Sequence, residues 1–429
     1  MTRTVIFDGV SVPQTFRTLV QDQVGHIDGF ESLFEQPTGD LPSDRWAAIT
    51  REQRLLNPHI ILADVLADPS RATEAGVEDY QGRAHDLLEI DDPVAPIVLW
   101  VDAQTDRLSR LTTMEHDPLR RDVTVEVTYE DWDSGTAILF PAHVELRLAG
   151  QVLHSEQRDS VMVNGELPAD TFDFPPRAAP VHVEADAERG AHRHQWHRGF
   201  ASIGIPMSGV QSAIEATELH DGVHHLAGGS HHSLVVEQAG GVVVIDAPLY
   251  DARCVAILDW IEQSLGGAPT THIVISHFHS DHSACARTFI ARGATLVIGE
   301  DARDAWDAIL TAPSTLRPDE LSRNPVDDPP IMVVPDGGAL TLDDPEHPVV
   351  LYDLRSEHAE DLLLPFVPDA GVLFSVDLFS PNLALPADNP QEVVDSLALH
   401  GITNDVSIVV GGHGAGTAAV ADIVAAAAG

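Results

Sequence analysis

The pattern of apolar and polar positions changes near the middle of the chain. In the first part, Val123–Tyr129 and His143–Leu148 alternate apolar and polar residues, and Ile97–Asp102 is a further strand-like run. Alternation with a period of two is typical of antiparallel strands that bury one face. These runs predict a β-rich N-terminal domain with an antiparallel sheet over residues 1–185, in which residues 16–75 show only short, weakly helical patterns.

The second part alternates strand-like and helical segments. A helical stretch is predicted near Ala252–Gln263, and apolar strand-like runs lie at 233–237, 242–246, 271–276, 295–298, 349–354, 371–376 and 406–410. Alternation of this kind predicts a layered domain of strands and helices over residues 216–429. The Pro- and His-containing segment 186–215 is predicted to link the two domains. The predicted fold class of the whole chain is α+β.

The composition is strongly acidic. The chain has 67 Asp and Glu residues against 24 basic residues, a formal net charge of −43, and every basic residue is Arg. Nucleic acid requires a basic footprint and anionic membranes would repel this charge, so neither is an expected partner. No apolar run approaches the roughly 18 residues of a membrane-spanning helix. A high-salt cytoplasm would screen such a surface, which makes a halophilic source a hypothesis.

The cysteine content bears on the cellular compartment. Cys254 and Cys285 are the only cysteines, and they do not form a Cys-x-x-Cys pair, so no disulfide framework is expected. The first residues show no charged segment followed by an apolar stretch and a cleavage site. A cytoplasmic location is therefore expected, with an exported protein whose leader has been removed as the alternative. Whether the chain forms a homo-oligomer stays open.

The strongest chemical signal directly follows the predicted strand at 271–276. The sequence His277-Phe-His279-Ser-Asp281-His282 places three imidazoles and a carboxylate within six positions. These nitrogen and oxygen donors are the ones that zinc or iron prefers. In an extended segment alternate residues share a face, so His277 and His279 are expected to hold one metal ion, while Asp281 and His282 turn toward a second.

This motif resembles the His-x-His-x-Asp-His motif of the metallo-β-lactamase-fold superfamily. The later ligand positions of that family are matched in order by His358, Asp377 and His413, each of which follows a predicted strand. The resemblance runs from about residue 219 to the C-terminus and implies an αββα sandwich. It also implies that His277, His279 and His358 hold one metal ion and that Asp281, His282 and His413 hold the other. Asp377 would lie between the two metals.

The resemblance further implies an activity. Two zinc ions are expected, with iron or manganese as alternatives, and they would activate a hydroxide that attacks an ester, thioester, lactone or related bond of a small molecule. Asp281 and Asp377 are then the expected catalytic carboxylates. The presence of Asp377 points away from the true β-lactam hydrolases. A mononuclear iron oxygenase of the persulfide type and a non-catalytic ligand-binding or carrier protein are the alternative functions.

Several other polar residues have two interpretations each. Asp246 matches a family Asp that can orient a ligand imidazole, and the alternative is a turn-capping role. His231 and His232 could contact substrate, but a solvated turn is the preferred interpretation. Three histidines of the predicted linker are expected to be flexible linker residues and not an accessory metal site: His192, His194 and His197. Cys285 is expected to be a small buried thiol and not a nucleophile.

The N-terminal part has a resemblance of its own. Gly82-Arg-Ala-His85-Asp86 and Val163-Asn164 resemble segments of the curved sheet of periplasmic lipoprotein carriers. The resemblance implies a concave apolar face that could hold a hydrophobic ligand. A structural or dimerising role is the alternative.

Overall fold

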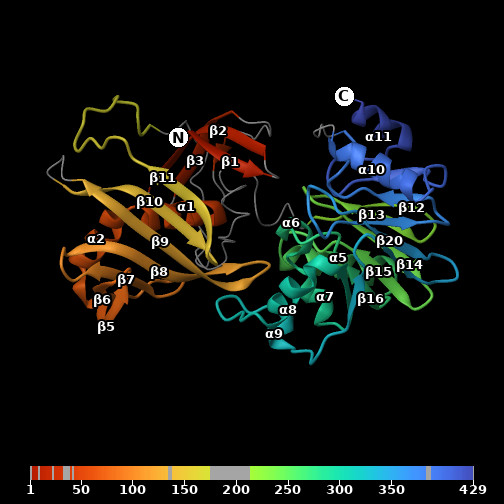
Figure 1. Ribbon diagram of the computed structural model, residues 1–429, viewed down its shortest axis with the longest axis horizontal. Helices are drawn as coiled ribbons and strands as arrows, with labels where there is room; N and C mark the ends of the chain where they lie inside the picture. The colour runs from red at the N-terminus through yellow and green to blue at the C-terminus, as the bar shows by residue number, and fades with distance from the viewer. Residues whose placement is uncertain are drawn as a thin grey trace. The chain divides into compact units, whose positions relative to one another are not determined.

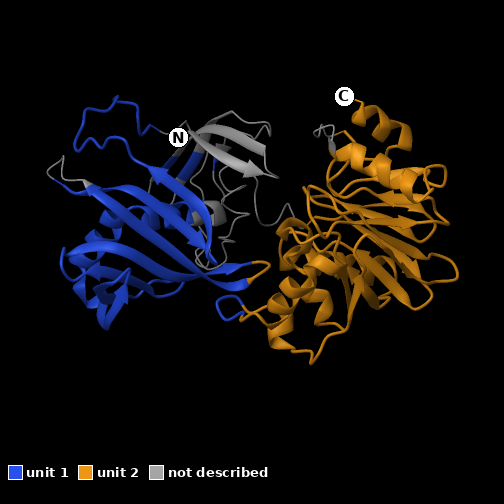
Figure 2. Ribbon diagram, viewed as in Figure 1, with its two compact units in different colours: residues 1–117, 121–207, 314–317 blue, residues 118–120, 208–313, 318–429 orange. Residues whose placement is uncertain are grey.

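The structure is a computed structural model, and the described residues form two compact units (Figure 2). The described ranges are 2–7, 10–21, 24–31, 39–40, 43–133, 138–173, 213–382 and 388–428. Unit 1 comprises residues 1–117, 121–207 and 314–317, and unit 2 comprises residues 118–120, 208–313 and 318–429.

Most of the predicted linker lies outside the described residues. Only its last three positions, 213–215, are described, and His192, His194 and His197 are not among them. The predicted domain boundaries at residues 185 and 215 therefore stay predictions.

Unit 1 contains two antiparallel sheets (Figure 1). Four strands in the order β1-β2-β3-β4 form the smaller sheet, and seven strands in the order β11-β10-β9-β8-β7-β6-β5 form the larger one. The strands of the smaller sheet are β1 (Thr2–Phe7), β2 (Val10–Gln21), β3 (Val24–Glu31) and β4 (Gly39–Asp40). Those of the larger sheet are β5 (Ala72–Tyr80), β6 (Arg83–Ile90), β7 (Ile97–Asp102), β8 (Arg107–Asp117), β9 (Arg121–Asp133), β10 (Phe140–Leu148) and β11 (Gln151–Gln157).

The helical prediction for residues 16–75 is wrong at its beginning. Residues 16–31 belong to strands β2 and β3, and the helices are α1 (Ser43–Leu56) and α2 (Pro58–Ala67), followed by the single-turn η1 (Pro69–Arg71). Cross-strand pairing of β2 with β1 and β3 explains the difference, because hydrogen bonding and packing between neighbouring strands override weak local helix propensity.

Helices α1 and α2 pack on the larger sheet. Leu55, Leu56 and Ile61 join alternate residues of the strands, such as Val125 and Val127, in one apolar cluster. The apolar face that period-two alternation predicted is thus present, and helix side chains cover part of it. The carrier-like resemblance of this sheet stays a prediction.

Unit 2 contains two further sheets and the helices that flank them. The mixed sheet consists of β12 (Glu215–His220), β13 (Val223–Ala227), β14 (Ser233–Gln238), β15 (Gly241–Ile245), β16 (Thr270–Val274), β17 (Thr295–Gly299) and β18 (Ile331–Val334). The second sheet consists of β19 (Ala339–Leu342), β20 (Val349–Asp353), β21 (Leu363–Val367), β22 (Val372–Phe374) and β23 (Ile408–Val410). The helical elements are α5 (Asp251–Ser264), α6 (Ser280–Ser283), α7 (Ala286–Ile290), η4 (Glu300–Ala302), α8 (Arg303–Thr311), α9 (Glu320–Arg323), α10 (Asp388–Leu399) and α11 (Val420–Ala427).

The two sheets of unit 2 face each other across a shared core. Successive residues of a strand point to opposite faces, so Val243 and Ile245 of β15 enter the core between the sheets, together with Leu351 and Phe374. Val244, on the other face, packs against α5 and α7. Because both faces are covered, the central strands are apolar throughout.

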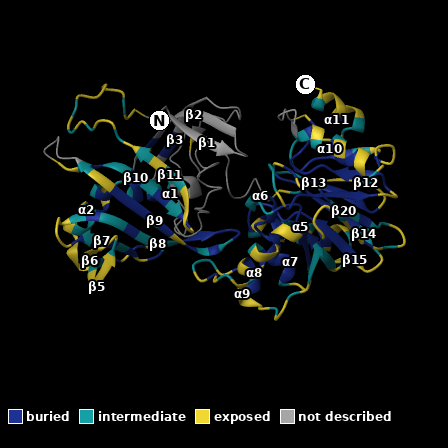
Figure 3. Cartoon of the chain, in the orientation of Figure 1, coloured by how far each residue is buried: buried dark blue, intermediate teal, exposed yellow. Residues whose placement is uncertain are grey.

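The second sheet is covered on its outer face in the same way. Leu373 of β22 and Val409 of β23 pack against Val393 and Leu397 of α10 and Ile423 of α11. Figure 3 shows the central strands of this unit buried, with exposed positions on the helices and the loops. The predicted αββα sandwich is therefore confirmed, as is the α+β class.

A disulfide joins Cys254 in α5 to Cys285, which directly precedes α7. Both residues are fully buried. The expectation of no disulfide is therefore wrong, because α5 and the segment after the metal-binding motif pack side by side although 31 residues separate the two cysteines. Both predicted locations, cytoplasmic and exported, stay predictions.

Among the described helices, none is long and apolar enough to cross a bilayer.

The disulfide should contribute measurably to stability. Closing a loop of 31 residues restricts the unfolded chain, so reduction should lower the free energy of unfolding by about 3–4 kcal/mol. Denaturant unfolding of the wild type refolded with and without reductant measures this difference. A Cys254→Ala/Cys285→Ala variant is the control and should be insensitive to reductant. Equal stability of the oxidised and reduced wild type would contradict the prediction.

Candidate metal centre

The predicted ligands gather at one end of the αββα sandwich, where several strands reach their carboxyl ends. Asp246 directly follows β15, and residues 277–282 follow its parallel neighbour β16. Asp377 and His413 follow the parallel pair β22 and β23, and His358 follows β20. Carboxyl ends of parallel strands meet at one edge of a sheet, so residues far apart in the sequence come together there.

The first donor group contains His277, His279 and His358. The Nε2 atom of His277 lies 3.1 Å from Nδ1 of His279 and 3.2 Å from Nε2 of His358. The ring nitrogens of three histidines thus converge within the spacing that two ligands of one zinc ion adopt, about 3.4 Å for tetrahedral geometry. The predicted grouping of these three residues is present.

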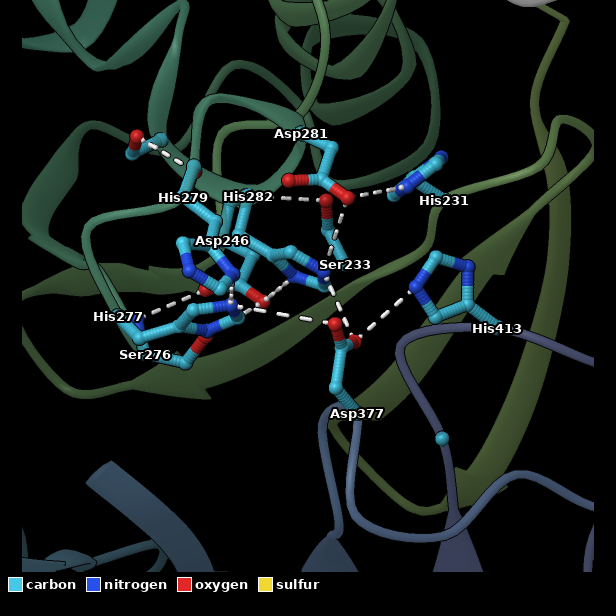
Figure 4. A network of polar contacts seen from close by, with 12 residues as sticks. His231, Ser233, Asp246, Ser276, His277, His279, Asp281, His282, Asp377 and His413 are labelled. Atoms are coloured by element: carbon cyan, nitrogen blue, oxygen red, sulfur yellow. Dashed lines mark hydrogen bonds and ion pairs between the residues drawn. The ribbon is translucent and has the colours of Figure 1, made fainter. Parts of the chain in front are cut away.

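The second donor group contains Asp281, His282, His413 and also His231. Asp377 lies between the groups (Figure 4). Its Oδ1 atom is 2.9 Å from His282 Nε2 and 3.0 Å from His413 Nε2. Its Oδ2 atom is 3.3 Å from His358 Nε2. One oxygen of Asp377 therefore faces each donor group.

Hydrogen bonds to the outer ring nitrogens aim the histidines of this centre. The Nδ1 atoms of His277, His282 and His413 contact Ser276 Oγ at 3.0 Å, Asp246 Oδ2 at 2.8 Å and Ser230 O at 2.8 Å, respectively. Each contact leaves Nε2 directed toward the centre. Metal-binding histidines characteristically have one nitrogen held by the protein in this way.

The charges at this centre call for a cation. Asp246, Asp281 and Asp377 are all buried, and within the described residues the ion pairs of these three carboxylates go only to histidines. His282 Nε2 and Asp377 Oδ1 are both buried, and at 2.9 Å they form an ion pair without good hydrogen-bond geometry. Buried carboxylates need a paired charge or a metal. The donor set therefore fits a bound metal ion.

The protonation states of the histidines point in the same direction. Burial, reinforced by nearby His282 and His279, lowers the pKa of His277 well below its ordinary value, so this imidazole is neutral, as a ligand must be. Burial also disfavours the charged form of His282, but Asp377 and Asp246 outweigh it and raise the pKa of His282 well above its ordinary value. Without a metal ion, a proton on His282 partly neutralises the charges of Asp246 and Asp377. A bound cation would take over this role.

Asp246 makes the contact that its sequence position predicted. Its Oδ2 accepts from His282 and from Ser276 Oγ at 3.0 Å, and its Oδ1 accepts from the Ser276 backbone N–H at 2.8 Å. Its φ of +68° is in the left-handed region, where Asp and Asn are tolerated best. Val376, which precedes Asp377, has φ of +51°, a strained conformation for a β-branched residue. Left-handed backbone, at Asp246 itself and at the residue before Asp377, therefore sets the direction of these two carboxylates.

A glycine lets the last loop approach the centre closely. A Cβ atom at Gly412 would lie 2.9 Å from His282 Cε1 and 3.1 Å from the Val376 carbonyl oxygen. The Gly412 N–H donates to that carbonyl at 2.7 Å. Only glycine fits here without displacing His282.

The turn that carries His231 and His232 is not solvated. The two residues are 2% and 4% exposed, so the preferred sequence interpretation is wrong. The guanidinium of Arg253, itself buried, donates to the backbone carbonyls of Leu226, Ala227 and His231 and pins this turn to α5. Neither the length of the turn nor its Gly and Ser residues could reveal this long-range contact.

Comparison with known proteins shows a likeness of fold. No protein-family model matches the sequence, and curated proteins give no match. A metallo-β-lactamase from Pontibacter korlensis has 16% identity and a TM-score of 0.39 over 50% of this chain and 98% of its own. FIM-1 from Pseudomonas aeruginosa, in a mono-zinc form, has 14% identity and a TM-score of 0.40 over 51% and 96%. A Hirschia baltica enzyme has 16% identity and a TM-score of 0.38 over 50% and 96%.

These similarities concern about half of the chain. The αββα layers that were predicted for this part are observed in the structure itself.

Asp361 is a residue near the centre that sequence reasoning missed. It is 7% exposed, and its carboxyl group accepts from the backbone N–H of Phe278, between His277 and His279. Burial, with the charges of Asp301 and Asp353, raises the pKa of Asp361 to about 6. Its sequence surroundings are ordinary, and only the fold places it against the metal-binding motif.

The raised pKa of Asp361 predicts a pH-dependent stability. The folded state holds the proton more tightly than the unfolded chain, so this contribution is complete below about pH 4 and is lost as the pH rises to about 6. Asp361→Asn should therefore be more stable than the wild type above pH 6, by about 2–3 kcal/mol, and gain little at pH 4. Denaturant unfolding from pH 4 to pH 8 measures the gain. Glu360→Gln, at an exposed neighbour, is the control, and a pH-independent gain for Asp361→Asn would contradict this origin.

Proposed function

We propose that the chain is a metal-dependent hydrolase with a dinuclear zinc centre. The observation that carries this proposal is the position of Asp377, whose two oxygens face two separate groups of donors. His277, His279 and His358 would hold one metal ion, and Asp281, His282 and His413 the other. A carboxylate between two such groups suits a shared role, in agreement with the ligand order that the sequence predicted.

Two bound cations would supply an activated water at neutral pH and polarise the oxygen of the bond to be cleaved. The residues of the chain prepare the place for this chemistry. Asp246 and Ser276 hold His282 and His277 in orientation. The His277 and His282 side chains are fully buried, whereas His413 keeps 22% of its side chain exposed. Substrate would therefore approach from the partly exposed side of the centre, which carries His279 and His413.

The charges near the centre favour neutral or weakly charged small molecules. Three buried carboxylates and a net charge of −43 disfavour polyanionic substrates. We propose an ester, thioester, lactone or related bond as the one cleaved.

Removal of one predicted ligand tests the proposal. His279→Ala should hold one metal ion per chain instead of two and lose roughly 10³-fold or more of the hydrolytic rate, because the centre loses several kcal/mol of transition-state stabilisation. Elemental mass spectrometry and a panel of esters, thioesters and lactones measure the two effects. His272→Ala, on the preceding strand and outside the donor groups, is the matched control.

The metal content of the wild type separates this function from its alternatives. Two zinc ions per chain support the hydrolase. One iron per chain would instead indicate the oxygenase, and no bound metal would indicate the carrier protein. Full hydrolytic activity of a folded His279→Ala variant would refute the proposed centre.

A second prediction concerns the residue that orients His282. Asp246→Asn keeps a side chain that tolerates the left-handed backbone but removes the negative charge next to His282 Nδ1. Loss of such a partner should weaken metal binding 10–100-fold. Competition with a chromophoric chelator measures the affinity. Unchanged affinity would show that Asp246 only caps its turn.

A further inference from the structure

We propose that His231 is itself a metal ligand, which gives the second donor group four protein ligands. This inference rests on the proposed metal centre and deepens it. The four residues are His231, Asp281, His282 and His413, and one potential ligand atom of each lies within 4.8 Å of the others. The family resemblance assigns no ligand at position 231, which lies between β13 and β14.

The geometry of His231 matches that of the first donor group. Its Nε2 atom is 3.0 Å from Asp281 Oδ2, close to the 3.1 and 3.2 Å that separate the donor nitrogens of that group. Its ring centroid is 4.2 Å from that of His413 and 5.5 Å from that of His282. The corresponding spacings in the first group are 4.6 to 4.9 Å. His231 thus belongs to the cluster by position.

The surrounding structure holds His231 in this place. Its Nδ1 atom contacts Ser230 Oγ at 2.7 Å, so Nε2 is the atom that faces Asp281. When Nδ1–H donates to that hydroxyl, Nε2 keeps its lone pair for a metal ion. Arg253 donates to the His231 carbonyl at 3.3 Å, and His413 donates to the Ser230 carbonyl at 2.8 Å. Contacts on both sides therefore fix the imidazole before a metal binds.

A fourth ligand would make the two halves of the centre unequal. Four protein ligands complete a tetrahedral set, as in structural zinc sites, whereas three leave a position open. The second group would then hold its metal more tightly than the first, with Asp377 still facing both groups. The first group, with three histidines, would keep the open position for water or substrate.

The alternative role of His231 is to hydrogen-bond Asp281 without touching the metal. Two substitutions separate the roles, because His231→Gln retains an N–H donor for Asp281 but offers no imidazole nitrogen. As a ligand, His231 is replaced by neither Gln nor Ala, and both variants should lose more than about 100-fold in affinity for the second metal. That loss exceeds the 10–100-fold cost of a hydrogen-bonding partner. His232→Gln, at the buried neighbour, is the matched control.

The readouts are independent of catalysis. Metal per chain is measured by elemental mass spectrometry after dialysis, affinity by chelator competition, and coordination by the visible absorption of the cobalt(II)-substituted full chain. His347→Ala is measured in parallel, because His220, His347 and Asp369 form a separate partly exposed group that could bind an additional ion. Near-ultraviolet circular dichroism checks that each variant is folded.

The Asp377→Asn background gives the sharpest outcome. With His231 as a ligand, Asp377→Asn/His231→Gln should hold its second metal more than about 100-fold more weakly than Asp377→Asn does, because only Asp281, His282 and His413 remain in that donor group. A His231→Gln variant with wild-type affinity and an unchanged cobalt spectrum would overturn the inference while the two-metal hydrolase stands. A wild type that holds fewer than two metals would instead overturn the proposed function.

Discussion

Burial of three carboxylates at one end of a β-sandwich is the constraint on which the centre depends. Asp246, Asp281 and Asp377 have left water, and their described ion pairs go to imidazoles. Imidazole can compensate a carboxylate only by taking a proton, which its ordinary pKa does not ensure at neutral pH. A metal cation compensates the charge without a proton. The seven predicted ligands and His231 lie where they could bind a cation that compensates this charge.

The packed sandwich holds the buried carboxylates and histidines rigidly in place. Both sheets of the sandwich are packed on both faces, so the strand ends that carry the donors have little freedom to relax. Left-handed backbone at Asp246 and Val376 is tolerated because the packed loops hold it. The disulfide of Cys285 ties the segment after Asp281 and His282 to α5. A preformed centre costs little reorganisation when it binds its metal or its substrate.

Local sequence patterns predicted the parts of the fold that depend on short-range order. Strands β9 and β10 were predicted from the alternation of apolar and polar residues, and β7 from its apolar run. The motif at 277–282 was found because its donors lie within six positions. Strands β2 and β3, the disulfide and the burial of His231 were not predicted. The disulfide and the burial of His231 depend on contacts between segments far apart in the sequence, whereas β2 and β3 form hairpins whose residues lack the clear period-two alternation that identified β9 and β10.

The amino-acid sequence by itself determined the chemistry of the donors and their order along the chain, because side-chain type and strand periodicity are local properties. Tertiary structure alone decided which donors share a pocket. His231 faces Asp281 across 50 positions, and His413 contacts Ser230 across 183. Such pairs form only when the two sheets close on a common core and bring the ends of distant strands together. The physical reason is that hydrophobic burial selects the sheet arrangement, and this arrangement then fixes the distances between donors.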